Sequence, residues 1–299
     1  MAECEFFLGV DGGGTRCRAR LCGRAGIALG EGEAGPANLR LGIAVSLAAV
    51  LVAARQCLTA AGLAEAALAR TAACLSLAGA SEPAELAAAR RQMLPFGRTL
   101  FVTDAYAACI GAHQGADGGV VIAGTGSIGW TVVAGRQYRV GGWGLPLSDE
   151  GSGAWLGREA LRVVLQAHDG RTRWTGLLHR LSDDFNRNPH GIVRWAAGAT
   201  PADFGALAPL VVDHASRGDD AAIGLMQSAA AHIEALAARL VELGADRLAL
   251  VGGLAAAVAP WLGDDARRHF VAPLGDGLAG ALLLARADAA AEPAREAAL

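Results

Sequence analysis

The chain has 299 residues, 53% of them hydrophobic, and a formal net charge of −3. A chain of this length holds one large domain or two ordinary ones, which excludes a disordered or disulfide-dependent miniature. Acidic and basic residues are mixed along the chain, so no basic patch for a nucleic-acid backbone is predicted.

The N-terminal segment MAECEFF carries acids where a signal peptide needs cations, so a cytoplasmic protein is expected. The longest uncharged stretch, residues 118–135, holds six glycines and strand-like alternation, which indicates a hairpin rather than a membrane span. The six cysteines include no CxxC pair, and the seven histidines never approach HxH or HExxH spacing. Reduced structural thiols are therefore favoured over metal-binding cysteines, and satisfied or exposed histidines over metal ligands.

Short apolar runs alternate with helical patterns in the first part of the chain. Strands are predicted at residues 6–10, 18–22, 73–77 and 99–103. Helices are predicted at residues 41–61, 82–94 and 105–113. This alternation predicts βαβ units around a parallel or mixed sheet.

A second strand–turn–strand pattern begins at Val120, where VVIA, GTGS and IGWTVV follow one another. It echoes the first hairpin and suggests duplicated domains, with a boundary near Gly115–Gly118. Further helices are predicted at residues 153–168, 221–243 and in GLAGALLLA, and a strand at 248–251. No regular structure is assigned to residues 171–209, and fraying is expected over residues 289–299.

The turn DGGGT places glycines where backbone amides could approach phosphate oxygens, while Asp11 could hold Mg²⁺ through water. An ordinary hairpin turn is the alternative, although it gains nothing from a third glycine. The turn GTGS offers amides and hydroxyls in the same way. Extended to Gly129 it spells GxGxxG, but a dinucleotide fingerprint opens a helix, whereas IGWTVV continues as a strand. Asp149 and Glu150 follow about twenty residues on, so that interpretation is weakened rather than excluded.

Asp104 follows a strand, at the edge where open α/β sheets place their ligands. A catalytic base belongs there, and a helix N-cap is the alternative. Asn38 and the run GGWGLPLSDEGS combine an amide, an indole and paired carboxylates, as a polyhydroxylated ligand requires. The alternative is a helix start capped by Ser148 or Asp149, beside a core tryptophan. In LALVGGLA, paired glycines could admit a flat ligand or simply form a turn.

Taken in order, DGGGT, GPAN, TDAYAA, AGTGS, GGWG with SDEGS, and LVGGLA resemble the N-acetylglucosamine and glucosamine kinases. These belong to the BadF/BadG/BcrA/BcrD type of ATPase, within the actin, sugar kinase and heat-shock chaperone superfamily. The resemblance covers Gly9 to about Ala285. It implies an α/β fold of two actin-like ATPase (ribonuclease H-like) domains with an interdomain cleft, at residues 1–116 and 117–299. The terminal helix could pack back on the first domain.

The resemblance also implies which residues bind the substrates. Phosphate loops are implied at Asp11, Gly12, Gly13, Gly14, Thr15, Gly124, Thr125, Gly126 and Ser127, an adenosine loop at Gly252 and Gly253, and an adenine-side position at Ala215. Sugar contacts are implied for Asn38, Gly79, Asp104, Gly142, Trp143, Gly144 and Asp149, with Asp104 as general base. The implied reaction transfers the γ-phosphate of ATP, with Mg²⁺, to the 6-hydroxyl of N-acetylglucosamine or glucosamine. A cytoplasmic homodimer without nucleic-acid or membrane partners is expected.

Four alternatives are weighed against this resemblance. The cysteine–histidine zinc motif of another bacterial sugar-kinase family is missing. A transcription regulator would need a DNA-binding segment, for which we expect no room before the strand at Phe6. The activator ATPases of the same domain type carry an iron–sulfur cluster, and no suitable cysteine pairing is evident. An ATP-driven switch acting on a partner protein stays the alternative, and it would hydrolyse ATP without sugar.

Overall fold

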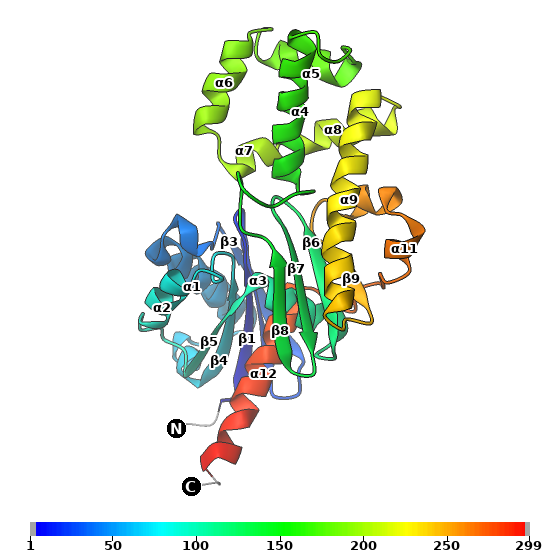
Figure 1. Cartoon of the computed structure of the whole chain (residues 1–299). Coiled ribbons are helices and arrows are strands. Elements are labelled where there is room, and N and C mark those ends of the chain that lie inside the picture. Colours follow the sequence, from blue (N-terminus) through cyan, green and yellow to red (C-terminus); the bar gives the residue numbers. More distant parts are fainter. Residues whose placement is uncertain (1–3, 297–299) are drawn as a thin grey trace. The chain divides into compact units, whose positions relative to one another are not determined.

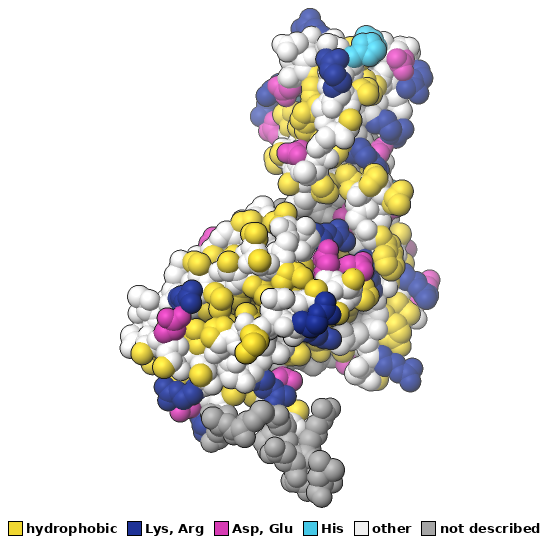
Figure 2. Space-filling view, turned by 90° about the vertical axis from the view of Figure 1, so that its left-hand side faces the viewer, with side chains coloured by type: hydrophobic (Ala, Val, Ile, Leu, Met, Phe, Trp, Pro, Cys, Tyr) yellow, Lys and Arg dark blue, Asp and Glu magenta, His cyan; other side chains and the backbone are white. Residues whose placement is uncertain are grey.

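The computed structural model describes the backbone of residues 4–296 and the side chains of residues 4–291. The chain forms two compact units (Figure 1), which we call unit 1, within residues 1–117 and 273–299, and unit 2, residues 118–272. On the face shown in Figure 2, arginine and acidic side chains lie interspersed among hydrophobic and neutral ones.

Unit 1 is built on a five-stranded sheet with the order β3-β2-β1-β4-β5. Its strands are β1 (Phe6–Gly12), β2 (Cys17–Gly23), β3 (Ala28–Ala34), β4 (Thr71–Leu77) and β5 (Arg98–Thr103). β1, β2 and β3 pair antiparallel, whereas β4 runs parallel to both β1 and β5. The sheet is therefore mixed, and β1, β4 and β5 end at the same edge.

Helices cover both faces of this sheet. They are α1 (Ile43–Ala60), α2 (Pro83–Arg90), α3 (Asp104–His113) and α12 (Gly277–Glu296), with 3₁₀ turns at η1 (Leu39–Leu41) and η2 (Glu65–Arg70). α1 packs on β2 and β3, and its Val50 joins Leu8 and Leu75 in one core. α3 and α12 pack together, so closely that a Cβ on Gly280 would lie 1.9 Å from the carbonyl oxygen of Ala107.

The helix α1 is long and apolar enough to cross a membrane by length and composition alone. One such helix is weak evidence, because a core helix of a soluble protein passes the same test. Its residues Leu47, Val50 and Cys57 are buried in the core of unit 1. We therefore assign α1 to that core.

Unit 2 combines a four-stranded sheet with a group of helices. The strands, in the order β8-β7-β6-β9, are β6 (Gly118–Ala123), β7 (Ser127–Val133), β8 (Arg136–Gly141) and β9 (Leu248–Val251). The helices are α4 (Gly153–His168), α5 (Gly176–Asp184), α6 (Pro189–Gly198), α7 (Pro201–Gly205), α8 (Ala208–Ser216), α9 (Asp220–Glu242), α10 (Ala255–Val258), η3 (Ala259–Trp261) and α11 (Asp264–Arg267). α9 packs against the sheet, where Gly129 of β7 lets Leu240 approach closely.

Most predicted elements are confirmed to within two residues at each end. Three predictions are wrong. α2 ends at Arg90 rather than Leu94, residues 171–209 contain helices α5, α6 and α7 and the start of α8, and α12 continues to Glu296 instead of fraying from residue 289. An ion pair between Arg98 of β5 and Asp288 links α12 to the edge of the sheet. Residues 297–299 lie outside the described residues.

Candidate active site

The carboxyl ends of β1, β4 and β5 form a row across the sheet of unit 1. Gly12 pairs in register with Leu77, and Leu77 pairs with Thr103. β4 lies between β1 and β5, and neighbouring strands are about 4.8 Å apart. The strand end before Asp104 is therefore two strand spacings from the DGGGT turn. The structure thus brings the predicted base and the first glycine turn to one edge of unit 1.

Asn38 and Gly79 join the same edge through the backbone. Residue 38 forms a parallel bridge with Ala78, whose N–H donates to the carbonyl oxygen of Gly12 at 2.8 Å. Gly79 has φ +84°, and a Cβ there would lie 2.8 Å from Oδ1 of Asn38. A side chain at position 79 would therefore displace Asn38.

The three glycines of DGGGT differ in what their missing side chains allow. A Cβ on Gly12 would lie 2.6 Å from Leu77 and 2.8 Å from the carbonyl oxygen of Ala37, so close packing requires glycine there. Beside Gly13 and Gly14 the nearest atoms would be 3.6 and 4.0 Å away. Since packing does not require glycine at these two positions, the open space beside them suits the approach of a ligand to the backbone.

Asp11 is held by an arginine. Nη2 of Arg18 donates to Oδ2 of Asp11 at 2.6 Å, and Nη1 lies 3.0 Å from Oδ2 of Asp276 at the start of α12. Burial alone would lower the pKa of Arg18, but the two carboxylates together raise it above its ordinary value. Asp11 and Asp276 thus share one cation.

This arrangement limits how Asp11 could take part in holding Mg²⁺. Its Oδ2 is engaged by Arg18, and among the described residues no three histidine, cysteine or acidic side chains form a metal-binding group. Mg²⁺ commonly keeps several waters and uses only one or two carboxylates beside substrate phosphates. The residues therefore fit a nucleotide-borne Mg²⁺ reached by Asp11 through water, but not an all-protein metal cage.

Asp104 is not the N-cap of α3, so the alternative role of helix cap is wrong for this residue. The N-cap is Thr103, whose Oγ1 accepts a hydrogen bond from the N–H of Tyr106 at 3.1 Å. Asp104 is the first residue of the helix, and its Oδ1 accepts from the N–H of Ala105 at 2.9 Å. The carboxylate is half-buried at the sheet edge. The capping role belongs to the neighbouring threonine, so capping does not account for Asp104.

In unit 2, the GTGS turn is fixed to the beginning of α4. The N–H of Gly153 donates to the carbonyl oxygen of Gly124 at 2.8 Å, and that of Ala154 donates to Thr125 at 3.1 Å. Oγ of Ser127 donates to the carbonyl oxygen of Glu150 at 2.7 Å. β7 continues from Ser127 as a strand, which agrees with the argument against a dinucleotide fingerprint. The Ser127 hydroxyl has a structural partner, so phosphate contacts would fall to Thr125 and the backbone.

Asp149 lies beside both the GTGS turn and the GGWG loop. Its Oδ1 accepts from the N–H of Gly144 at 3.0 Å, and a Cβ on Gly126 would lie 2.6 Å from its Oδ2. The prediction that Ser148 or Asp149 could cap α4 is wrong, because Ser152 is the N-cap. Asp149 instead lies between two loops that are apart in the sequence, residues 124–127 and 141–144.

Trp143 stands on the surface, so the core-tryptophan alternative is wrong. Its side chain is 71% exposed, and Cζ of Arg139 lies 4.0 Å from the ring centroid. Arg139 also donates to the carbonyl oxygens of Gly141 and Gly142. A Cβ on Gly142 would lie 2.7 Å from Ile128, so glycine is needed there. This loop presents an indole to solvent, as a sugar-stacking residue requires.

The paired glycines of LALVGGLA, Gly252 and Gly253, lie next to the GTGS turn. A Cβ on Gly252, which has φ +104°, would lie 2.4 Å from the carbonyl oxygen of Ala123, whereas the space beside Gly253 is open. The backbone nitrogen of Gly253 would lie 3.9 Å from a Cβ on Gly124. Ala215 lies in α8, buried in the core of unit 2, and its contact with adenine stays a prediction.

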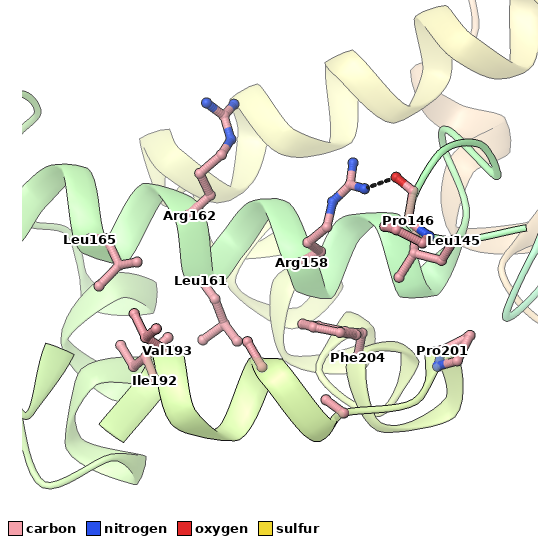
Figure 3. Close-up of a pocket in the computed structure, with 12 residues that line it drawn as sticks. Leu145, Pro146, Arg158, Leu161, Arg162, Leu165, Ile192, Val193, Pro201 and Phe204 are labelled. Atoms are coloured by element: carbon pink, nitrogen blue, oxygen red, sulfur yellow. Dashed lines mark hydrogen bonds between the residues drawn. The ribbon is translucent and has the colours of Figure 1, made fainter. Parts of the chain in front are cut away.

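A pocket of about 490 Å³ lies between α4 and the α6–α7 segment of unit 2. Figure 3 shows how its lining residues are arranged. Its walls are mostly apolar, with Leu161, Ile192 and Phe204 among them, and Nη1 of Arg158 donates to the carbonyl oxygen of Pro146 at its rim. None of the predicted site residues lines it. The pocket nevertheless borders the GGWGLPLSDEGS run, because Leu145 and Pro146 of that run line it.

The cysteines are free thiols, and all but Cys4 are buried. Burial raises the pKa of the Cys17 thiol to about 12, with Asp11 and Cys57 adding to the effect. A thiol with so high a pKa stays protonated at neutral pH. Because the thiolate is the nucleophile, such a thiol is unreactive. The burial of the other five cysteines agrees with the predicted structural role.

The chain is similar in sequence and structure to known kinases. It is 39% identical over 281 residues to the glucosamine kinase GspK of Vibrio cholerae, covering 94% of this chain and 96% of the relative. A solved structure from Chromobacterium violaceum, provisionally named an N-acetylglucosamine kinase, matches with a TM-score of 0.88 and 38% identity. That match covers 95% of this chain and all of the other.

A ROK family glucokinase from Streptomyces griseus, solved with glucose and AMPPNP, matches with a TM-score of 0.54 and 19% identity, over 94% of this chain and 99% of the other. At that identity the match shows the fold alone, and it confirms the predicted actin-like α/β fold, which the structure shows with mixed sheets of five and four strands. The family model for the BadF/BadG/BcrA/BcrD ATPases matches residues 8–285. The chain belongs to the BadF/BadG/BcrA/BcrD ATPase family.

Proposed function

We propose that this protein is an amino-sugar kinase, which transfers the γ-phosphoryl group of Mg-ATP to the 6-hydroxyl of glucosamine or N-acetylglucosamine. The observation that carries the proposal is the edge of unit 1, where Asp104, Asn38, Gly79 and the DGGGT turn follow adjacent strand ends or bridge them. The 39% identity to a glucosamine kinase over 94% of the chain supports the choice of substrate class.

In the proposed reaction, Asp104 accepts the proton of the sugar hydroxyl as its oxygen attacks the γ-phosphorus. The new oxygen–phosphorus bond forms while the bond between the γ-phosphorus and the β–γ bridging oxygen breaks, and ADP leaves. Bound Mg²⁺ would neutralise charge on the phosphates. Positioning supplies much of the acceleration in such transfers, and a positioned base contributes about 10²- to 10⁴-fold.

Each unit contributes different groups to this proposal. Unit 1 offers Asn38 and Gly79 for the sugar and the open backbone at Gly13 and Gly14 for phosphate. Unit 2 offers the GTGS turn for phosphate and the open side of Gly253 for the adenosine. Its exposed Trp143 and the loop-bridging Asp149 would contact the sugar. Ala215 would lie on the adenine side.

A coupled assay of ADP release tests the proposal directly. Glucosamine, N-acetylglucosamine, N-acetylmannosamine and glucose are compared with and without Mg²⁺, and phosphorus NMR of the product identifies the phosphorylated hydroxyl. We expect ADP release to depend on an amino sugar and on Mg²⁺, with a 6-phosphate product. ADP release at the same rate without any sugar would contradict the kinase and favour an ATP-driven switch that acts on a partner protein.

We further propose a cytoplasmic homodimer. Sedimentation velocity of the purified full chain tests the oligomeric state, and fractionation of the native host tests the location. A monomer across the working concentration range, or recovery with the membranes, would contradict the respective part.

A further inference from the structure

Glu85, in the first turn of α2, has a buried carboxylate oxygen without a partner. Its Oε2 accepts no hydrogen bond from any described residue, and none of the ion pairs among the described residues includes Glu85. Buried polar atoms in proteins almost always have a hydrogen-bond partner. An unpaired buried oxygen therefore calls for a donor that the chain itself does not supply.

This oxygen lies at the predicted sugar site. A Cβ placed on Gly79 would be 3.3 Å from Oε2 of Glu85 and 2.8 Å from Oδ1 of Asn38. Both acceptor oxygens thus flank the same glycine. Oδ1 of Asn38 already accepts from the N–H of Arg40 at 3.0 Å, whereas Oε2 of Glu85 has no such donor.

The position of Glu85 in the helix explains why an acidic residue occurs there, but not why its Oε2 is buried without a partner. An acidic residue in the first turn is favoured by the helix dipole, which accounts for a carboxylate in the first turn of α2. The dipole gives no reason to bury one oxygen beside Gly79, since Glu82 serves the same helix end while exposed to solvent. A ligand group that donates to Oε2 gives such a reason.

We infer that Glu85 receives the 2-ammonium group of a hexosamine and so selects the free amine over the N-acetylated sugar. An ionised carboxylate only accepts hydrogen bonds, and a cation is its strongest donor. An N-acetyl group offers one neutral N–H and a carbonyl oxygen, which a carboxylate repels. Glu85 is thus a specificity-determining residue, and this inference rests on the proposed function.

The variant Glu85→Gln tests it, because it keeps the shape of the side chain and removes the charge. We expect kcat/KM for glucosamine to fall about 10- to 100-fold, the range for losing a hydrogen bond to a charged group. The loss on glucose and on N-acetylglucosamine should be at least about tenfold smaller. Glu82→Gln, in the same helix start but exposed, is the matched control and should leave all three values near wild type.

Calorimetric binding of glucosamine without ATP provides a second measurement, in which the wild type should bind more tightly than Glu85→Gln. The KM of the wild type for glucosamine should also rise once the pH exceeds the pKa of the sugar ammonium, and Glu85→Gln should flatten this rise. Equal losses on all three sugars, or no loss on glucosamine, would overturn the inference while leaving the kinase intact. A wild-type enzyme that phosphorylates none of the sugars would overturn the proposed function and the inference with it.

Discussion

The carboxylate of Asp149 lies directly against Gly126, so that a Cβ on the glycine would stand 2.6 Å from Oδ2. Oδ1 of the same carboxylate accepts the N–H of Gly144 at 3.0 Å. The glycine turn after β6 and the loop that carries Trp143 are therefore coupled through one acidic side chain. A change at Gly126 should be transmitted to the loop.

Gly126→Ala should displace Asp149 and disturb both loops. We expect kcat/KM for ATP and for the sugar to fall about 10- to 100-fold, the cost typical of misplacing a substrate-positioning group. Gly224→Ala is the control, since a Cβ there meets no atom within 4 Å. That control should be neutral or stabilising by about 1 kcal/mol in the helix α9. Steady-state kinetics and thermal melting check both variants, and wild-type kinetics in Gly126→Ala would contradict the coupling.

Gly79→Ala tests the sugar side of unit 1. The new Cβ would press on Asn38 at 2.8 Å, in addition to the strain of φ +84°. We expect KM for the sugar to rise at least about tenfold. Gly62→Ala separates the two effects, because φ is +67° but the space is open. Both variants should lose about 1–2 kcal/mol of stability from the left-handed backbone, and only Gly79→Ala should lose sugar affinity. A similar KM in the two variants would argue against a sugar contact at this position.

The stability of unit 2 should depend on Asp219 in acid. Burial alone would raise the pKa of Asp219, but hydrogen bonds from the N–H groups of Leu177, at 2.8 Å, and Ala222, at 3.1 Å, hold it below its ordinary value. The contribution of Asp219 is therefore present above about pH 4, the unfolded pKa, and is lost as the pH falls through the lower folded pKa.

Asp219→Asn should lower stability by about 1–3 kcal/mol at neutral pH, as expected when buried donors lose a charged acceptor. The difference from wild type should shrink below about pH 4. Urea unfolding measures this stability difference between about pH 3 and pH 7, a range that includes the unfolded pKa of about 3.9. The exposed neighbour Asp220→Asn is the control. A difference that stays constant down to the lowest pH would rule out the titration of Asp219 as its cause.

The elements that the sequence predicts are those whose apolar pattern alone specifies them, such as β4 and α4. The edge strand β3, ALGEGEA, shows no such pattern because glycines replace its inward-facing side chains. A Cβ on Gly30 or Gly32 would lie 2.2 or 2.1 Å from carbonyl oxygens of α1. Close contact with the α1 backbone, rather than side-chain burial, thus fixes β3.

The starts of two helices between residues 171 and 209 could have been predicted from the sequence. Asn188 and Thr200 each precede a proline and cap the helix that follows. An Asn-Pro or Thr-Pro pair is typical of a helix start, with the proline at the first helical position. These helices are short, five to ten residues, so hydrophobic periodicity alone gives them little signal.

The candidate site was predictable as a set of glycine turns and strand ends, but the partners within it were not. Arg18 binds Asp11 because β1 and β2 pair in a register that sets residue 11 opposite residue 18. Glu85 carries no motif, and only the burial of Oε2 beside Gly79 distinguishes it from Glu82. Such relationships depend on packing between segments distant in the sequence.

The central claim is that Asp104 is the base that accepts the sugar proton. The most direct measurement is kcat of Asp104→Asn with saturating ATP and amino sugar, together with calorimetric binding of the sugar. We expect kcat to fall about 10²- to 10⁴-fold while the dissociation constant of the sugar changes little. A kcat within a few-fold of wild type would contradict the account.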